Sequence, residues 1–159
     1  MRKCKIENNK PNDDIKPDCI IARNFKFLDE LTHCGEKEIA LDSDIFFEAE
    51  YLFTYLECIK LDVDDLIIDG NGFTIDAKRN SRIFNSTGKN ITIKNITLKN
   101  GFSQDHGGTI VNACELTIKK SVLTNSKSEK DEGPILNLGK LNIEELIFTV
   151  KKRILNDIY

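Results

Sequence analysis

The chain has 159 residues, of which 40% are hydrophobic and 31% are charged, and its formal net charge is −3. This length and balance predict one domain with a sizeable core. The slightly acidic charge argues against nucleic acid as a main partner, because binding it requires a face that neutralises many phosphates. No apolar run approaches the roughly 18 residues that a membrane span requires, so we expect no membrane insertion.

The N-terminal segment is polar. Residues 1–24 contain the run NNKPNDD and are expected to form a mobile arm. The chain begins MRKCKIENNKPNDD, and no apolar segment follows this basic start, so the sequence predicts no export signal.

The cysteines are widely spaced: Cys4, Cys19, Cys34, Cys58 and Cys114. No two of them form a C-x-x-C pair, and the chain has only 2 histidines, so we expect thiols rather than a zinc site. The sequence does not exclude a disulfide between distant cysteines. We expect no cofactor.

Residues 25–60 are expected to form an N-terminal cap and the first strands. Asn24 suits the N-cap of a short helix over NFKFLDELTHCG, whose apolar residues share one face, and Gly35 ends the helix. The run EIALDSDIFF then indicates strand, turn and strand. Apolar and polar residues alternate over 59–63, which favours a further strand.

Residues 61–150 repeat with a period of about 25 residues, and a period of this size indicates a solenoid. Apolar residues alternate within each unit (LTI, ITI, LNI), so the units consist of strands rather than helices. We expect inward-facing columns made by Leu66, Ile91, Leu116 and Leu141, by Ile68, Ile93, Ile118 and Ile143, and by Phe73, Leu98, Leu123 and Phe148.

Asparagines recur where the coils are expected to turn, because short polar side chains tolerate left-handed backbone and bond locally. These turn asparagines are Asn85, Asn112, Asn137, Asn100 and Asn125. Each strand is expected to pair in parallel with the same strand of the next coil, about 4.8 Å away. We therefore predict an all-β fold: a right-handed, single-stranded parallel β-helix of about four coils with a short N-terminal capping helix.

The repeat fades at Val150, and residues 151–159 are expected to form a tail. The basic run from Lys151 to Arg153 is typical of a solvated segment. A solenoid needs caps at both ends, and the sequence shows none at the C-terminal end. We therefore expect either a piece of a longer rod or self-association through the uncapped C-terminal coil.

Four motifs follow one another in a characteristic order: DGNGFTID at Asp69–Asp76, RIFN at Arg82–Asn85, a strand pair at Asn90–Asn100, and GGTI at Gly107–Ile110. This order resembles the adhesin-like surface proteins with right-handed parallel β-helix repeats, a pectin-lyase-like fold related in pattern to the polymorphic outer-membrane protein repeats. The resemblance covers about residues 25–148. It implies a secreted or cell-surface protein that binds a ligand through a rod and has no catalytic residues.

An acidic cluster lies in DVDDLIIDGNGFTID. Pectate-lyase-type β-helices hold calcium with carboxylates on parallel strands, beside a basic residue that acts as the base. The residues that would serve here are Asp62, Asp64, Asp65, Asp69 and Asp76 as carboxylates, and Arg79, Arg82 and Lys94 as bases. Tight turns use the same residue types, and we favour turn chemistry, with Asp69 and Asp76 as the weak metal candidates.

The loop GFSQDHGG pairs Asp105 with His106, which are residue types that perform acid–base chemistry. Adjacent loop residues rarely face each other, so we favour a solvated loop. Three N-x-[ST] triplets, at Asn85, Asn90 and Asn95, are glycosylation candidates. Asn85 is favoured among them because its turn is the longest.

Polar residues lie between the inward residues of successive strands: Thr92, Lys94, Thr117, Lys119, Asn142 and Glu144. Such a ladder suits a glycan or a surface-protein ligand, although any solvated sheet face has this texture. The favoured function is a non-enzymatic, adhesin-like cell-surface binding module. The alternatives are a carbohydrate-active β-helix of the pectate-lyase type and a truncated fragment of a longer surface protein with no independent function.

Overall fold

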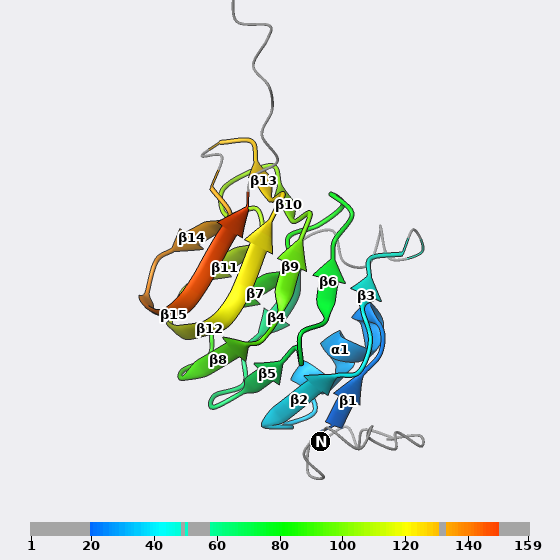
Figure 1. Ribbon diagram of the computed structural model, residues 1–159. Coiled ribbons are helices and arrows are strands. Elements are labelled where there is room, and N and C mark those ends of the chain that lie inside the picture. Colours follow the sequence, from blue (N-terminus) through cyan, green and yellow to red (C-terminus); the bar gives the residue numbers. More distant parts are fainter. Residues whose placement is uncertain (1–19, 49, 51–57, 131–132, 150–159) are drawn as a thin grey trace, which may run out of the picture.

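The structure is a computed structural model that describes residues 20–48, 50, 58–130 and 133–149. In these residues the chain winds as a parallel β-solenoid of about four coils, with one short helix near its N-terminus (Figure 1). Strands of successive coils pair in parallel throughout the described part. The parallel β-helix predicted from the repeat is confirmed.

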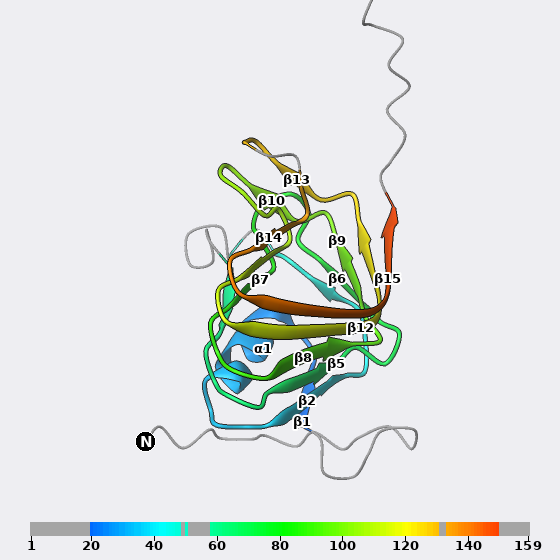
Figure 2. The same ribbon diagram turned by 90° about the vertical axis from the view of Figure 1, so that its left-hand side faces the viewer.

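The coils have three faces, which Figure 2 shows from the C-terminal end. The first face holds β1 (Ile20–Ala22), β2 (Glu38–Leu41), β5 (Ile67–Asp69), β8 (Ile91–Lys94) and the first halves of β12 (Glu115–Thr124) and β15 (Lys140–Thr149). The second face holds β3 (Ile45–Phe46), β6 (Thr74–Asp76), β9 (Thr97–Lys99) and the second halves of β12 and β15. The third face holds β4 (Ile59–Leu61), β7 (Phe84–Ser86), β11 (Ile110–Asn112) and β14 (Ile135–Asn137).

A separate pair of short strands projects from the coils. It consists of β10 (Phe102–Ser103) and β13 (Lys127–Ser128), which pair in parallel with each other (Figure 2). The loops that carry β10 and β13 follow the second face of their coils, so the extra residues leave the core columns undisturbed.

Aliphatic columns fill the interior. In the column of Ile68, Ile93 and Ile118, each side chain is 0% exposed and pairs with its neighbour in the next coil. The alternation of buried and outward residues along each strand places this column inside. Ile39 of β2 pairs with Ile68, so the column extends one coil further toward the N-terminus than the repeat in the sequence.

The third column differs from the prediction at one position. Ile75, and not Phe73, pairs with Leu98, and Ile75 is 0% exposed. Phe73 is only partly buried against the core. The reason is the turn after Asp69, which is longer than the corresponding turn after Lys94, so a constant period of 25 residues aligns the wrong residue.

The asparagines of the third face also differ from the prediction. Asn85, Asn112 and Asn137 lie in strands β7, β11 and β14 rather than in turns. Asn112 pairs with Ser86, one residue beyond Asn85, and both Asn112 and Ser86 are fully buried. The inward Asn112 amide donates to the Asn137 Oδ1 at 2.8 Å. Polar side chains therefore occupy an inner column at the end of this face.

Left-handed residues turn the corners between faces. Asn95, Lys120 and Glu145 have φ values of 51°, 45° and 58° and stand one above another between the first and second faces. Asn100 and Asn125 follow the second face with φ values of 55° and 54°. A single left-handed residue bends the strand sharply without interrupting the ladders on either side, which explains why asparagine recurs at these corners.

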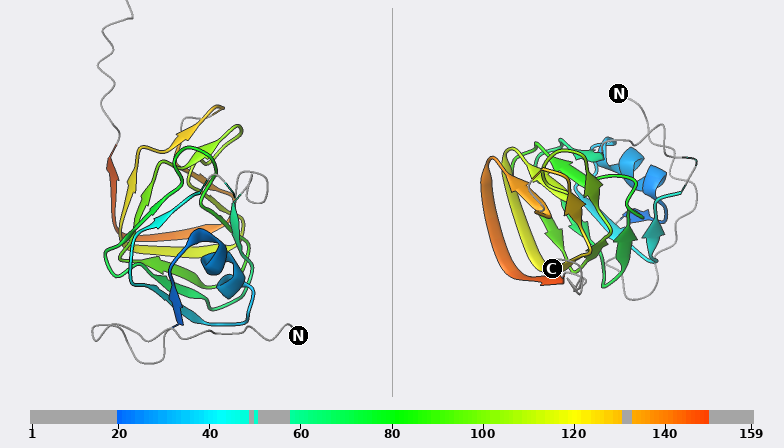
Figure 3. Two further views of the ribbon diagram at one scale, coloured as in Figure 1. Left: turned by 90° about the vertical axis from the view of Figure 1, so that its right-hand side faces the viewer. Right: turned by 90° about the horizontal axis from the view of Figure 1, so that it is seen from above.

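The helix α1 (Phe25–Thr32) closes the N-terminal end of the core. Figure 3 shows it within the outline of the coils. The Asn24 side chain accepts a hydrogen bond from the Phe27 N–H at 2.7 Å, as expected of an N-cap. Phe25 packs edge-on against Phe47 with 5.2 Å between ring centroids. Strand β1 lies within residues 1–24, which were predicted to form a mobile arm. Strand structure therefore begins earlier than the predicted boundary at residue 24.

One cysteine departs from the expectation of thiols. Cys34 is disulfide-bonded, whereas Cys58 and Cys114 are thiols, so the partner of Cys34 lies outside the described residues. In the part of the chain that the structure describes, no helix is long and apolar enough to cross a membrane.

The buried column yields a stability test. We expect Ile93→Asp to lower the free energy of unfolding by at least about 3 kcal/mol, because it places an unpaired carboxylate among aliphatic side chains. The matched control is Thr92→Asp, on the outward side of the same strand, which should cost less than about 1 kcal/mol. Urea unfolding followed by circular dichroism measures both changes. Equal losses for the two variants would contradict the inward assignment of Ile93.

Candidate binding surface

The polar ladder predicted on the first face has a defined register. Thr92, Thr117 and Asn142 form one outward column. Lys94, Lys119 and Glu144 form the second, and Asp69 continues it toward the N-terminus.

Ion pairs link coils along this second column. The Lys94 Nζ lies 3.2 Å from the Asp69 Oδ2, and the Lys119 Nζ lies 3.2 Å from the Glu144 Oε1. The lysines of the two central coils are therefore neighbours, with an acid at each end.

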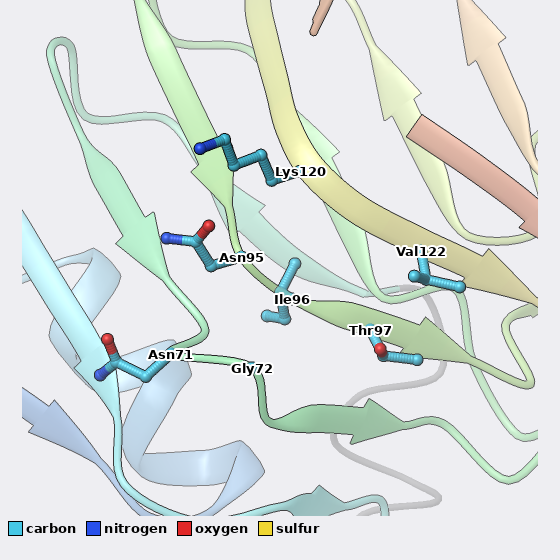
Figure 4. Close-up of a pocket in the computed structure, with 7 residues that line it drawn as sticks. All are labelled: Asn71, Gly72, Asn95, Ile96, Thr97, Lys120 and Val122. Atoms are coloured by element: carbon cyan, nitrogen blue, oxygen red, sulfur yellow. The ribbon is translucent and has the colours of Figure 1, made fainter. Parts of the chain in front are cut away.

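An open groove of about 450 Å³ lies at the corner where the first face meets the second (Figure 4). Its lining comes from three successive coils: Asn71, Gly72, Asn95, Ile96, Thr97, Lys120 and Val122. Figure 4 places Asn71 and Asn95 between strands, Thr97 on β9, and both Lys120 and Val122 on β12.

The longer turn after Asp69 forms one wall of the groove. Four residues separate Asp69 from Thr74 in that coil, whereas two separate Lys94 from Thr97 in the next. Gly70 allows this turn to lie on Ile96, because a Cβ at Gly70 would be only 2.4 Å from the Ile96 Cβ. Gly72 has a φ of 84°, which favours glycine. The motif DGNG therefore shapes the groove.

The groove combines hydrogen-bonding groups with an aliphatic floor. The Asn71 amide nitrogen donates to the Leu41 carbonyl at 2.8 Å, and the Asn95 amide nitrogen donates to the Asp69 Oδ1 at 3.2 Å. These contacts hold both side chains in place through their amide nitrogens. Ile96 and Val122 supply the apolar part.

A second, smaller groove adjoins the first. It has a volume of about 200 Å³ and is lined by Lys94, Asn95, Lys119, Lys120, Glu144 and Glu145. Asn95 and Lys120 belong to both grooves, so the two form one continuous surface, called here the corner groove. Among the described residues the exposed Lys120 ammonium has no ion pair or hydrogen bond, so it is the cation of this surface that remains for a ligand.

Asp69 and Asp76, the weak metal candidates, each serve their own turn. The Asp69 Oδ1 accepts from the Asn71 N–H at 3.0 Å. The Asp76 Oδ1 accepts from the Lys78 N–H and from the Asn100 amide, each at 2.8 Å. Within the described residues, no group of three or more His, Cys, Asp or Glu side chains is placed to hold a metal ion.

The other carboxylates of the acidic cluster also make structural contacts. The Asp64 Oδ1 accepts from the Lys89 N–H at 2.8 Å, and the Asp65 Oδ1 accepts from the Asn90 amide at 2.9 Å. Asp62 lies 3.7 Å from the His33 Nε2. These contacts join residues of different coils, so the cluster ties neighbouring turns together.

The arginines proposed as bases lie away from the corner groove. Arg82 donates to the Gly107 carbonyl, the His106 carbonyl and the Ser103 hydroxyl, each at 2.8 Å. The backbone N–H of Arg79 donates to the Asn100 carbonyl at 2.9 Å. Arg82 thus anchors the loop that carries β10.

The loop containing Asp105 and His106 is pinned by the next coil. Asp105 Oδ1 accepts a hydrogen bond from the Lys130 ammonium. This hydrogen bond and the positive charge of Lys130 lower the pKa of the Asp105 carboxyl below its usual value, and the same contact raises the pKa of Lys130. The Asp105 carboxylate therefore faces Lys130.

The three glycosylation candidates differ in their surroundings. Asn85 lies within β7, and its side-chain oxygen is buried. Asn90 is exposed in the turn before β8. Asn95 lies in the corner groove and is partly buried. The turn that favoured Asn85 in the sequence begins after Ser86, and Asn90 is the exposed one of the three, with its amide nitrogen donating to the Asp65 Oδ1 at 2.9 Å.

Sequence reasoning did not find the corner groove. Lys94, Lys119 and Glu144 belong to the predicted ladder, but Asn71, Ile96, Lys120 and Val122 were not singled out. The available signal was the unequal length of the turns after Asp69 and Lys94. Unequal turns on adjacent coils leave a step in the surface, and this step is the wall of the groove.

The fold and this surface define a parallel β-helix module with an open polar groove on its side. The family model of the pectate lyase-like adhesive domain matches residues 26–130, which is more than half of the chain. The chain therefore belongs to this family, and it is an adhesin-like module. The predicted resemblance is confirmed. No match is found among curated proteins or among solved structures.

The Asp105–Lys130 contact has a measurable consequence. We expect a carboxyl titration by NMR to give Asp105 a pKa below the usual range, and Lys130→Met to return it to that range. Because the pKa of Asp105 is lowered in the folded state, the contact stabilises the protein above the unfolded pKa and is lost as the pH falls through the folded pKa. Lys127→Met, on the neighbouring strand β13, is the control and should leave Asp105 unchanged. An unshifted Asp105 in the parent would refute the contact.

Proposed function

We propose that the chain is a non-catalytic, cell-surface adhesive module whose corner groove binds a glycan. The observation that carries the proposal is the lining of the groove, where two amide oxygens, a hydroxyl and an ammonium stand around an aliphatic floor. Sugars present hydroxyl groups that donate and accept hydrogen bonds, together with apolar C–H patches. A few placed polar groups over apolar side chains are typical of ligand sites.

Lys120 supports this proposal because the fold does not require a lysine there. Its backbone has a φ of 45°, a left-handed conformation that costs most side chains about 1 kcal/mol or more and that asparagine tolerates better. Asn95 occupies the same corner one coil earlier. Glu145 occupies the corner one coil later, so the corner accepts several residue types, and the use that we propose for the lysine is the ammonium that it brings to the groove.

The absence of turnover is part of the proposal. The residues that a pectate-lyase mechanism would use are engaged elsewhere: Asp69 and Asp76 in their turns, Lys94 with Asp69, and Arg82 with the β10 loop. The family to which the chain belongs is described as adhesive. We favour a surface location for the same reason.

The test separates binding from stability at one residue. A panel of neutral and acidic oligosaccharides first identifies the glycan that binds, and calorimetric titration then gives its affinity. We expect Lys120→Asn to weaken this affinity roughly tenfold or more, because a hydrogen bond from a charged donor is lost. The same variant should be as stable as the parent or up to about 1 kcal/mol more stable in urea, because asparagine suits the corner.

The matched control is Lys89→Asn, an exposed lysine outside the groove, which should leave affinity unchanged. Undiminished binding by Lys120→Asn would remove the corner groove as the site. Cleavage of any panel oligosaccharide by the purified chain would overturn the non-catalytic role.

A further inference from the structure

The C-terminal coil ends in an open sheet edge. Strand β15 is 10 residues long and pairs with β12 on one side, and no described strand pairs with its other side. Ile143 and Phe148 are 49% and 51% exposed, whereas Ile118 and Leu123, one coil inward in the same columns, are 0% and 2% exposed. Long apolar edges of this kind invite pairing with another strand.

Among the described residues, the opposite end of the stack offers no matching surface. The helix α1 covers the core there with the buried side chains of Phe25, Leu28 and Leu31. A head-to-tail stack would need an uncovered coil at both ends. The surface that matches an open β15 edge is therefore the same edge of a second copy, which gives a closed two-fold contact.

The peptide groups of β15 determine the register of such a contact. The Lys140 N–H donates to the Cys114 carbonyl at 2.7 Å, so the peptide groups of Lys140 face β12. Direction alternates along a strand, so the N–H and C=O groups of Leu141 and Ile143 face the open edge. These are the groups that a second strand would satisfy.

We infer that two copies of the chain pair through their β15 strands, antiparallel, about a two-fold axis at Asn142. In this register Leu141 and Ile143 of one copy exchange hydrogen bonds with Ile143 and Leu141 of the other. Lys140 then lies opposite the second copy's Glu144, and Asn142 lies opposite itself. These are the non-hydrogen-bonded pairs, in which side chains of an antiparallel ladder approach most closely.

Charge complementarity favours this register. Lys140 and Glu144 both lie on the outward side of β15, and each already has a partner one coil inward: Lys140 with Glu115 at 2.8 Å, and Glu144 with Lys119 at 3.2 Å. The contact extends these pairs into an alternating row of Glu115, Lys140, Glu144 and Lys119 across the two copies. Moving the axis to Ile143 would place Asn142 opposite Glu144 and lose both charge pairs.

The rest of the open end fits the same axis. A two-fold rotation through the first face reverses the order of the other two, so the second half of β15 in one copy meets β14 in the other. On the second half of β15, Phe148 and Ile147 are 51% and 59% exposed. Leu138, just after β14, is 69% exposed. The exposed apolar side chains of each copy are thereby brought to those of its partner.

The first experiment measures mass and affinity. Sedimentation of the full chain should show a reversible dimer of about twice the 18.1 kDa of one chain. Lys140→Glu or Glu144→Lys alone should raise the dissociation constant by about tenfold or more, because two charge pairs become repulsive. The double variant Lys140→Glu/Glu144→Lys should recover most of the affinity, although it loses both pairs with β12. The control Lys89→Glu, far from the edge, should change nothing.

The second experiment tests the axis itself. In Asn142→Cys the two introduced thiols face each other with Cα atoms about 4.5 Å apart, which suits a disulfide. Mild oxidation should link two chains through residue 142, as identified in the linked peptide by mass spectrometry. Thr117→Cys, at the same position one coil inward, should not link.

Three outcomes would overturn the inference. The first is a chain that stays monomeric at all concentrations. If the amides of Leu141 and Ile143 are then protected from hydrogen exchange at every concentration, another segment of the same chain covers the edge. Open-ended growth beyond the dimer is the second, because it requires a head-to-tail contact. A dimer in which Asn142→Cys does not link and the double charge reversal does not recover is the third, because it pairs through another surface.

Discussion

The structure depends on one constraint: a three-residue strand cannot bury its apolar side alone. Ile68 is shielded because Ile39 and Ile93 stack on either side of it, and the backbone of β5 pairs with the neighbouring coils on both sides. The free energy of burial therefore belongs to the stack and not to any single strand, as in other solenoids. This requirement keeps the inward columns in register from one coil to the next, and it leaves the chain free to vary only where it does not disturb that register.

Variation is consequently confined to corners and to the outward side, and the candidate site lies there. The extra residues after Asp69 fit because Gly70 and Gly72 carry them around the corner, while Ile68 and Ile75 keep their places in the columns. The corner groove forms on the outer surface beside these extra residues. The loop that carries β10 arises in the same way and is fastened by Arg82. A binding surface can therefore change from coil to coil at little cost to the core.

The same constraint explains how far the sequence could be interpreted. The alternation of apolar residues identifies the columns of Ile68 and Ile93 because inward residues must recur. A fixed period fails where turn lengths change, which is why Ile75 rather than Phe73 belongs to the third column and why Asn112 pairs with Ser86 rather than with Asn85. The corner groove escaped prediction because it depends on the difference between adjacent turns. The sequence could not predict the disulfide of Cys34, because the spacing of cysteines in a sequence does not determine which of them pair.

The two ends of the stack satisfy the constraint differently. At the N-terminal end, α1 supplies apolar side chains that no strand provides, and its Asn24 cap allows the chain to enter the helix directly from β1. At the C-terminal end of the described residues, Ile143 and Phe148 of the last coil are 49% and 51% exposed. A head-to-tail filament requires surfaces at the two ends that fit each other, and the two ends of this described stack differ. A two-fold pair requires only that one end fits itself. Among the described strands only β15 offers a free edge 10 residues long, so the pairing that we propose would use the exposed edge of both copies and end assembly at two.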